Sequence, residues 1–373
     1  MASGKRDDGK GRSAGDEIGR HRAAIDRIDG ELVRLIGERA GHAAAIGQLK
    51  GDGPVYRPER EAEVLRHAAA ANRGPLPDEA LNRIFVEVMS ACRAIEGRVR
   101  VGYLGPQGTF SEMAVARHFG GAIDAAPLAS IDEAFRQAET GATQFAVVPV
   151  ENSTEGAIGR TLDLLLRTPL RICAEVVLRV HQNLMAKGGD PTATGLAGRK
   201  RVYSHAQSLA QCHQWLLRNL PEAERVQVSS NAEAARLAAA EPEACAIGPE
   251  IAAGRYGLTV LARNIEDEAE NLTRFLVLGH LEPGPSGRDV TSLVLSAPNR
   301  PGAVHALIAP FATHGVSMSR IESRPARVGT WEYMFYIDLQ GHAHDPRIAA
   351  AIAELKGLAP FLKVLGSYPT ATP

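Results

Sequence analysis

Short apolar runs alternate with helical patterns through residues 98–282, and this alternation limits the possible folds more than any other feature of the sequence. Runs such as 145–150 and 244–248 have the length and composition of buried strands. Strands that are separated by helices predict an α/β fold with parallel strands, whose ligand sites lie at the carboxyl ends of the strands. Polar turns follow the expected strands at 105–112, 151–156, 204–208 and 271–275.

The last of these turns, Asn271-Leu272-Thr273-Arg274-Phe275, leads into the apolar run 276–278. Because that run is typical of a buried strand, we expect Thr273 and Arg274 to lie at the start of that strand, where a ligand can reach them. A threonine at the start of a strand is often only a β-forming residue with a satisfied hydroxyl. The pentapeptide therefore indicates a site only in combination with the other turns.

The composition excludes several classes of protein. A length of 373 residues suggests two or three domains, and a net charge of -1 without a basic block makes nucleic acid a poor partner. No apolar run approaches the roughly 18 residues of a membrane span, and the polar residues 1–15 are expected to form a disordered tail. The cysteines are widely spaced, which favours reduced thiols in the cytoplasm and gives no zinc signature. They are Cys92, Cys173, Cys212 and Cys245.

Residues 16–97 have the pattern of an all-helical domain. The stretch 16–50 has no proline and carries apolar residues at spacings of three and four, which predicts one long amphipathic helix. Two shorter helices are expected at 56–71 and 78–96. Because two short helices cannot cover such a long one, we expect a bundle that is completed by a second subunit.

Cations interrupt the apolar face of the long helix. At about 100° per residue, Arg39 and Lys50 fall inside that face and Arg22 lies at its edge. A single cation in such a position is commonly a snorkelling side chain, but three along one seam need anionic partners. A helical pocket with several cations and two carboxylates suits a small dianion.

This segment resembles the all-helical chorismate mutase family. The resemblance implies that two arginines, one from the long helix of each subunit, bind the carboxylates of chorismate, and that Lys50 and Glu96 act on its ether oxygen. Glu96 donates a hydrogen bond only when protonated, so we expect mutase activity to fall as the pH rises through its titration. Several family members carry Asp where this chain has Arg57. The implied chorismate-binding residues are Arg22, Arg39, Lys50, Arg57, Arg60, Glu61, Cys92 and Glu96.

Residues 98–282 resemble prephenate dehydratase, through the motifs GPQGTFSE, VENSTEG, YSHAQ and NLTRF. The resemblance implies two lobes like those of a type II periplasmic binding protein, with the site between them and Thr273 as the proton donor to the departing hydroxyl. Loss of water and CO2 gives an aromatic ring, so neither a metal nor a cofactor is expected. His205 is an alternative acid, although a histidine at a strand end is more often structural. The implied prephenate-binding residues are Thr109, Ser111, Asn152, Ser153, Gln207, Thr273 and Arg274.

The last part of the chain follows the linker 282–287 and has the order βαββαβ of a split ferredoxin-like domain, at 288–368. The segments 299–304 and 321–325 resemble the ACT regulatory domain, with Val304 where the family usually has Leu. The resemblance implies a phenylalanine site between paired domains, and a purely structural dimerisation module is the alternative. The implied effector-binding residues are Gly302, Ala303, Val304, Glu322, Ser323, Arg324 and Pro325.

Together the three resemblances predict a multidomain enzyme with a helical mutase bundle (16–97), a two-lobed α/β dehydratase (98–282) and an α+β ACT domain (288–368). Its small-molecule partners would be chorismate, prephenate and L-phenylalanine, without nucleic acid or membrane, in a cytoplasmic homodimer or higher oligomer. Two other interpretations remain open: a dehydratase of broad specificity that also accepts arogenate, and a catalytically inactive amino-acid sensor.

Overall fold

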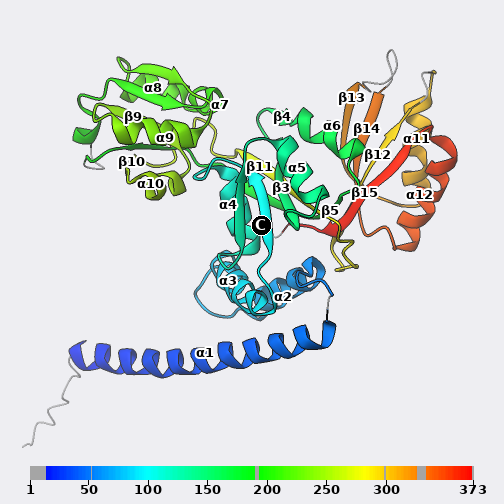
Figure 1. Cartoon of the computed structure of the whole chain (residues 1–373), viewed down its shortest axis with the longest axis horizontal. Coiled ribbons are helices and arrows are strands. Elements are labelled where there is room, and N and C mark those ends of the chain that lie inside the picture. Colours follow the sequence, from blue (N-terminus) through cyan, green and yellow to red (C-terminus); the bar gives the residue numbers. More distant parts are fainter. Residues whose placement is uncertain (1–13, 52, 190–192, 298–299, 326–332, 372–373) are drawn as a thin grey trace, which may run out of the picture. The chain divides into compact units, whose positions relative to one another are not determined.

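The computed structural model describes residues 14–51, 53–189, 193–297, 300–325 and 333–371 (Figure 1). The tail predicted for residues 1–15 lies outside this description except for Ala14 and Gly15, which begin the first helix. Asn299 of the first ACT motif is also outside the described residues, as is Trp331 at the start of an expected strand. The contacts divide the chain into two compact units, residues 1–53 and 54–373.

The first unit consists of one long helix, α1 (Ala14–Lys50), as the sequence predicted. Asp16 and Glu17 in its first turn and Lys50 in its last complement the helix dipole. None of its 37 residues is buried. Apolar residues such as Ile25 and Leu32 remain about half exposed, at 54% and 50%. An amphipathic helix with an uncovered apolar face needs a further packing partner.

The second unit begins with two helices, α2 (Pro58–Ala71) and α3 (Asp78–Glu96), which pack against each other. Pro58 occupies the first turn of α2, where its missing N–H costs no hydrogen bond. An aromatic cluster of Tyr56, Phe119 and Phe145 joins this helical pair to the domain that follows. The guanidinium of Arg93 lies over the rings of Tyr56 and Phe119.

The first lobe of the α/β region is a six-stranded sheet in the order β2-β1-β3-β11-β5, with β4 added to β3. Strands β1 and β2 are parallel, as are β1 and β3, but β11 is antiparallel to both β3 and β5. The predicted α/β class is confirmed, although the sheets are mixed. The elements are β1 (Arg100–Leu104), α4 (Phe110–Phe119), β2 (Asp124–Leu128), α5 (Ile131–Glu139), β3 (Phe145–Asn152), β4 (Gly156–Ala157), α6 (Gly159–Arg167), β5 (Arg171–Arg179) and β11 (Leu272–Gly279).

The second lobe is a five-stranded sheet in the order β10-β6-β9-β7-β8. The chain crosses into it after β5 and returns before β11, so β11 enters the first sheet from the opposite direction. After β7 the chain forms two short helices that meet at Cys212. The elements are β6 (Asn183–Ala186), η1 (Ala193–Leu196), β7 (Arg201–Ser204), α7 (Ala206–Gln211), α8 (His213–Asn219), β8 (Glu224–Gln227), α9 (Asn231–Ala240), β9 (Ala244–Gly248), α10 (Glu250–Tyr256) and β10 (Thr259–Ala262).

The C-terminal domain has the predicted βαββαβ order and an antiparallel sheet arranged β13-β14-β12-β15, with two helices over one face (Figure 1). Its strand β15 packs on β5 of the first lobe. A Cβ at Gly366 would lie 2.3 Å from the carbonyl oxygen of Ile172, so this close approach requires glycine. The elements are β12 (Asp289–Ser296), α11 (Ala303–Thr313), β13 (Met318–Pro325), β14 (Tyr333–Gln340), α12 (Pro346–Leu358) and β15 (Leu362–Pro369).

Candidate functional site

The paired ends of β3 and β11 place Thr273 directly opposite Asn152. The amide nitrogen of Asn152 donates to the Thr273 hydroxyl oxygen over 2.9 Å and to Oδ1 of Asn271 over 2.7 Å. Asn152 and Asn271 are both buried, at 5% and 2% exposure, whereas Thr273 is partly exposed. The structure therefore brings together residues that are about 120 positions apart in the sequence.

The orientation of the Asn152 amide is fixed by its other bonds. Its oxygen accepts hydrogen bonds from the backbone N–H groups of Thr154 and Glu155, over 3.1 and 3.2 Å. The amide nitrogen, which only donates, must therefore face Thr273. Because the Thr273 oxygen is the acceptor in that contact, its own proton is left to donate elsewhere.

Ser153 and Asn271 also lie at this end of the sheet, and they differ in their hydrogen bonding. Ser153 holds the turn to β11, because its hydroxyl oxygen accepts from the backbone N–H of Leu272 over 2.9 Å and its own N–H donates to the Leu272 carbonyl over 2.8 Å. The Nδ2 of Asn271 has no hydrogen-bond partner among the described residues. A buried donor of this kind is suited to a ligand oxygen. Asn271 is the first residue of the NLTRF motif, but it was not among the binding residues predicted from the sequence.

The loop before α4 contributes the next predicted residues. Thr109 is the N-cap residue of α4 and Ser111 is buried in its first turn. Glu112, which sequence reasoning missed, accepts from the Gly108 N–H over 2.5 Å and forms an ion pair with Arg255 of α10 in the second lobe. This ion pair joins the two lobes beside the glycine-rich loop. Its signal in the sequence was the last residue of the GPQGTFSE motif.

The second lobe presents amides and hydroxyls of its own. Gln207 lies on α7 and is partly exposed, and His205 is the N-cap residue of that helix without a capping side-chain bond. Ser208 accepts hydrogen bonds from the amides of Gln182 and Asn231, over 3.0 and 2.8 Å. The motif YSHAQ indicated this helix, but nothing in the sequence indicated the partners of Ser208.

Arg274 departs from its predicted place beside Thr273. Adjacent residues of a strand face opposite sides of the sheet, and the guanidinium of Arg274 contacts Glu175 over 2.7 Å and Asp338 over 2.6 Å. It also donates to the Tyr368 hydroxyl over 2.8 Å. Burial alone lowers the pKa of Arg274, but these three groups more than offset it and raise the pKa. In this structure Arg274 joins the first lobe to the C-terminal domain.

The predicted chorismate residues fall in both units. Arg22, Arg39 and Lys50 lie on α1 in the first unit, and Arg57, Arg60, Glu61, Cys92 and Glu96 lie on or beside α2 and α3 in the second.

Within the second unit, the Glu61 carboxylate forms an ion pair with Arg93, which sequence reasoning missed. Arg57, which is about half exposed, pairs over 2.5 Å with Glu59, whose side chain is 12% exposed. Arg60 likewise pairs with an exposed neighbour, Glu63, over 2.5 Å. Cys92 precedes Arg93 in the sequence and is buried, at 4% exposure.

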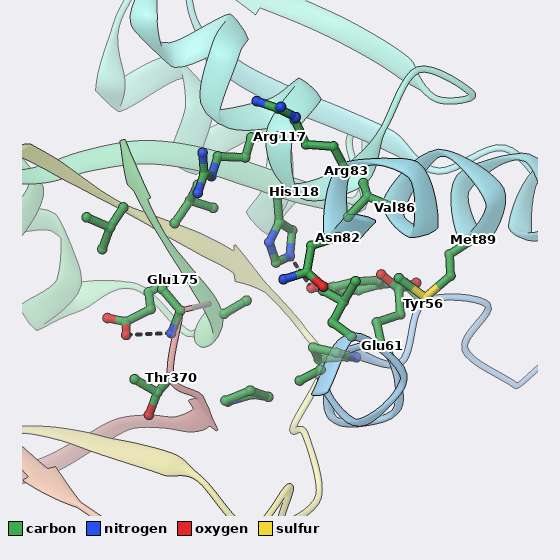
Figure 2. Close-up of a pocket in the computed structure, with 18 of the residues that line it drawn as sticks. Tyr56, Glu61, Asn82, Arg83, Val86, Met89, Arg117, His118, Glu175 and Thr370 are labelled. Carbon is green, nitrogen blue, oxygen red and sulfur yellow. Dashed lines mark hydrogen bonds between the residues drawn. The ribbon is translucent and has the colours of Figure 1, made fainter. Parts of the chain in front are cut away.

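A pocket of about 100 Å³ lies among α2, α3, α4, β5 and the C-terminal residues 369–371 (Figure 2). The Tyr56 hydroxyl faces Nε2 of His118 across a 2.5 Å hydrogen bond at its wall. Burial, together with the nearby Arg93, lowers the pKa of His118 to about 3, so the ring is neutral and accepts from the tyrosine. Glu61 and Glu175 also line the pocket, which connects the helical pair with the first lobe.

The predicted effector residues lie on the C-terminal domain. Gly302 has a left-handed conformation (φ 77°) at the start of α11, which glycine adopts without strain, and the side chain of Val304 is 42% exposed. Residues 322–325 lie on β13, an edge strand of the sheet. Arg324 contacts Asp163 of α6 over 3.5 Å, so it faces the first lobe.

The described residues hold no cluster of side chains suited to a metal ion. No helix in the described part of the chain is long and apolar enough to cross a membrane. All four cysteines are buried and free.

The fold and the arrangement of these residues define a modular protein with a helical segment, a two-lobed α/β domain that gathers polar side chains at strand ends, and a C-terminal βαββαβ domain. Three family descriptions match consecutive parts of the chain: chorismate mutase type II at residues 21–97, prephenate dehydratase at 101–283 and the ACT domain at 291–357.

Two relatives, each named bifunctional chorismate mutase/prephenate dehydratase, match along nearly their whole length. The one from Neisseria gonorrhoeae is 54% identical over 94% of this chain and 96% of its own. The one from Pseudomonas aeruginosa is 47% identical over 95% of this chain and 98% of its own. This chain belongs to the bifunctional chorismate mutase/prephenate dehydratase family.

A solved structure is similar to the last two domains. Prephenate dehydratase from Arthrobacter aurescens, in complex with L-Phe, is 36% identical with a TM-score of 0.66. The match covers 73% of this chain and 90% of that one. The predicted family and fold classes are confirmed.

Proposed function

We propose that this chain converts chorismate to prephenate in its helical segment and prephenate to phenylpyruvate between the lobes of its α/β domain, with inhibition by L-phenylalanine through the ACT domain. The observation that carries the proposal is the contact between Asn152 and Thr273, which leaves one hydroxyl proton available to a substrate. The family names of the relatives agree with both activities.

The dehydratase step requires an acid for a departing hydroxyl group. The C–C bond to the ring carboxylate breaks and releases CO2, its electron pair forms a ring double bond, and the C–O bond to the hydroxyl breaks. Thr273 supplies the proton that turns the leaving group into water. The negative charge that grows on its oxygen is stabilised by the N–H of Asn152, a donor already in place before the reaction.

The remaining predicted residues bind and orient prephenate. The N-terminus of α4, with Thr109 and Ser111, directs N–H groups and a positive dipole end toward a carboxylate. Gln207 approaches from the second lobe, and the Nδ2 of Asn271 is a further donor. Ser153 holds the turn that positions Asn152. We leave Arg274 out of the direct binding set, because its guanidinium is engaged by Glu175 and Asp338.

The mutase step needs no nucleophile, only a chair-like conformer and stabilisation of charge on the ether oxygen. We assign the substrate carboxylates to Arg22 and Arg39, and the ether oxygen to Lys50 and Glu96. Arg57, Arg60, Glu61 and Cys92 complete the proposed binding set. Within its own unit the apolar face of α1 has no element to pack against, which supports a dimer in which each long helix contributes to both sites.

The effector site is proposed at Gly302–Val304 and at Glu322–Pro325, between two ACT domains. The open edge of β13 and the exposed Val304 support such a pairing, and the L-Phe complex of the Arthrobacter aurescens relative supports the ligand. We further propose a cytoplasmic location, because four buried thiols without a disulfide suit a reducing compartment.

One assay tests the proposal as a whole. Purified protein is given chorismate alone, and chorismate loss and phenylpyruvate formation are followed with and without phenylalanine. Formation of phenylpyruvate that phenylalanine suppresses is the expected result. Accumulation of prephenate would contradict the dehydratase assignment, and untouched chorismate with bound phenylalanine would favour an inactive sensor. A competition between prephenate and arogenate decides whether the specificity is broad.

A further inference from the structure

Two pairs of charged residues connect the catalytic strands to the ACT domain. Arg274 on β11 lies directly opposite Glu151 on β3. Across the interface, Arg320 on β13 lies directly opposite Asp338 on β14. The four residues form two ion pairs, between Arg274 and Asp338 over 2.6 Å and between Glu151 and Arg320 over 2.9 Å.

The Arg274–Asp338 pair is shielded from solvent, with side chains that are 16% and 8% exposed. The Glu151–Arg320 pair is partly exposed, at 34% for Glu151 and 14% for Arg320. Asp338 also accepts a hydrogen bond from Ser292 over 2.5 Å, which fixes the second carboxylate oxygen. Separating the partners of a buried ion pair leaves each charge without compensation. This cost holds Arg274 and Asp338 in defined positions.

On the side of the first lobe, each charged residue is the neighbour of a proposed active-site residue. Glu151 precedes Asn152 on β3, and Arg274 follows Thr273 on β11. Side chains alternate along a strand, so Asn152 and Thr273 face one side of the sheet while Glu151 and Arg274 face the ACT domain. A displacement of Glu151 and Arg274 therefore moves the backbone segments that also carry Asn152 and Thr273.

On the side of the ACT domain, Arg320 belongs to the strand that carries the second effector motif. Ile321 and Ser323 are exposed on one face of β13, while Arg320 and Arg324 are less exposed and contact the first lobe from the other. A ligand that binds at the exposed face and shifts β13 would shift Arg320 with it. Figure 1 shows β13 beside α6 of the first lobe, which carries Asp163, the partner of Arg324.

We propose that the ion pairs Arg274–Asp338 and Glu151–Arg320 couple effector binding to the dehydratase site, and that all four are positioning residues for Thr273 and Asn152. This inference rests on the proposed function and adds its route of regulation. Effector binding that favours one position of β13 and β14 shifts the populations of two arrangements of the Asn152–Thr273 pair.

Other contacts across the same interface provide matched controls. Lys363 donates to the carbonyls of Leu165 and Thr168 over 2.9 and 2.5 Å, and Tyr336 donates to the carbonyl of Leu162 over 2.7 Å. All three acceptors lie in or just after α6. These hydrogen bonds of Lys363 and Tyr336 therefore strengthen the interface, but they involve neither β3 nor β11.

The experiment uses the full chain with Asp338→Asn and Arg320→Gln as test variants, and Lys363→Met and Tyr336→Phe as controls. Phenylalanine affinity is measured by calorimetry, and the dehydratase kcat and KM are measured with and without saturating phenylalanine. Coupling between two sites is typically about 5- to 150-fold. We expect the test variants to retain phenylalanine binding but to lose most of its effect on the dehydratase, while the controls remain inhibited like the wild type.

One further variant separates charge from folding. Arg320→Lys keeps the positive charge and should restore most of the inhibition that Arg320→Gln loses. Full inhibition of both Asp338→Asn and Arg320→Gln would overturn the inference, as would equal loss in Lys363→Met. If the wild-type chain itself shows no dehydratase activity, or no response to phenylalanine, the proposed function fails instead. Mutase activity of each variant reports whether the chain is folded.

Discussion

Asn152 and Thr273 face each other on neighbouring antiparallel strands, and the amide of Asn152 donates to the threonine hydroxyl over 2.9 Å. The contact has a direction, because backbone N–H groups occupy the amide oxygen of Asn152. Thr273 is therefore an acceptor toward the protein and a donor toward the substrate. This polarity is what a weak acid needs in order to protonate a leaving hydroxyl.

Replacement of Thr273 tests the proton donor. We expect Thr273→Val to lower the dehydratase kcat by about 10²- to 10⁴-fold, the usual contribution of a positioned acid. Thr273→Ser keeps the hydroxyl and should retain far more activity than the valine variant. Chorismate mutase activity, measured on the same samples, serves as the control and should not change. Equal activity of the valine and wild-type proteins would contradict the assignment.

Asn152→Asp reverses the direction of the key hydrogen bond. A carboxylate keeps the acceptor for Thr154 and Glu155 but has no N–H for Thr273, whose proton would then go to the carboxylate instead of the substrate. We expect the dehydratase kcat to fall by roughly 10²-fold, as on removal of one donor from an oxyanion site. Asn219→Asp, at an exposed amide that donates to the carbonyl of Trp215, is the matched control. Loss of substrate binding with unchanged kcat would argue for a binding role alone.

Glu96→Gln tests the second acid. A glutamine always donates to the ether oxygen, whereas Glu96 donates only while protonated. The glutamine variant should therefore have a faster mutase rate than the wild type at neutral pH. Initial rates of chorismate loss for the two proteins give the answer. A slower glutamine variant with unchanged chorismate binding would remove Glu96 from this role.

His118 should make the stability of the second unit depend on pH. Its folded-state pKa of about 3 lies below the ordinary value of 6.5, so the unfolded chain binds the proton more readily. The stability is complete above pH 6.5 and falls as the pH drops toward 3, by up to about 1.4 kcal/mol per pH unit. Because the ring lines a pocket and keeps some exposure, we expect less than the full slope.

Urea unfolding at pH 6.5 and pH 5 measures this effect. The midpoint of the wild type should decrease more between these two values than that of His118→Gln, which has no proton to gain. His67→Gln removes an exposed histidine from α2 and should follow the wild type. The same pH dependence in all three proteins would show that another group is responsible.

Several features were predictable from the sequence because they depend on local patterns. The proline-free stretch 16–50 fixed α1 to within two residues at its start. The alternation of apolar runs and helices gave the α/β class, the resemblance to prephenate dehydratase implied the two lobes, and the motifs marked the turns at Asn152 and Thr273. A pattern of period two also implies that Thr273 and Arg274 face opposite sides of β11, a signal that our prediction for Arg274 did not use.

Other features depend on which surfaces meet, and no local pattern contains that information. The sequence alone determined the domains, their order and the residues at the strand ends. Only the tertiary structure decided that Arg274 meets Asp338, 64 residues away, and that Glu151 meets Arg320. The physical reason is that a buried charge needs a partner, but packing of distant strands selects which one.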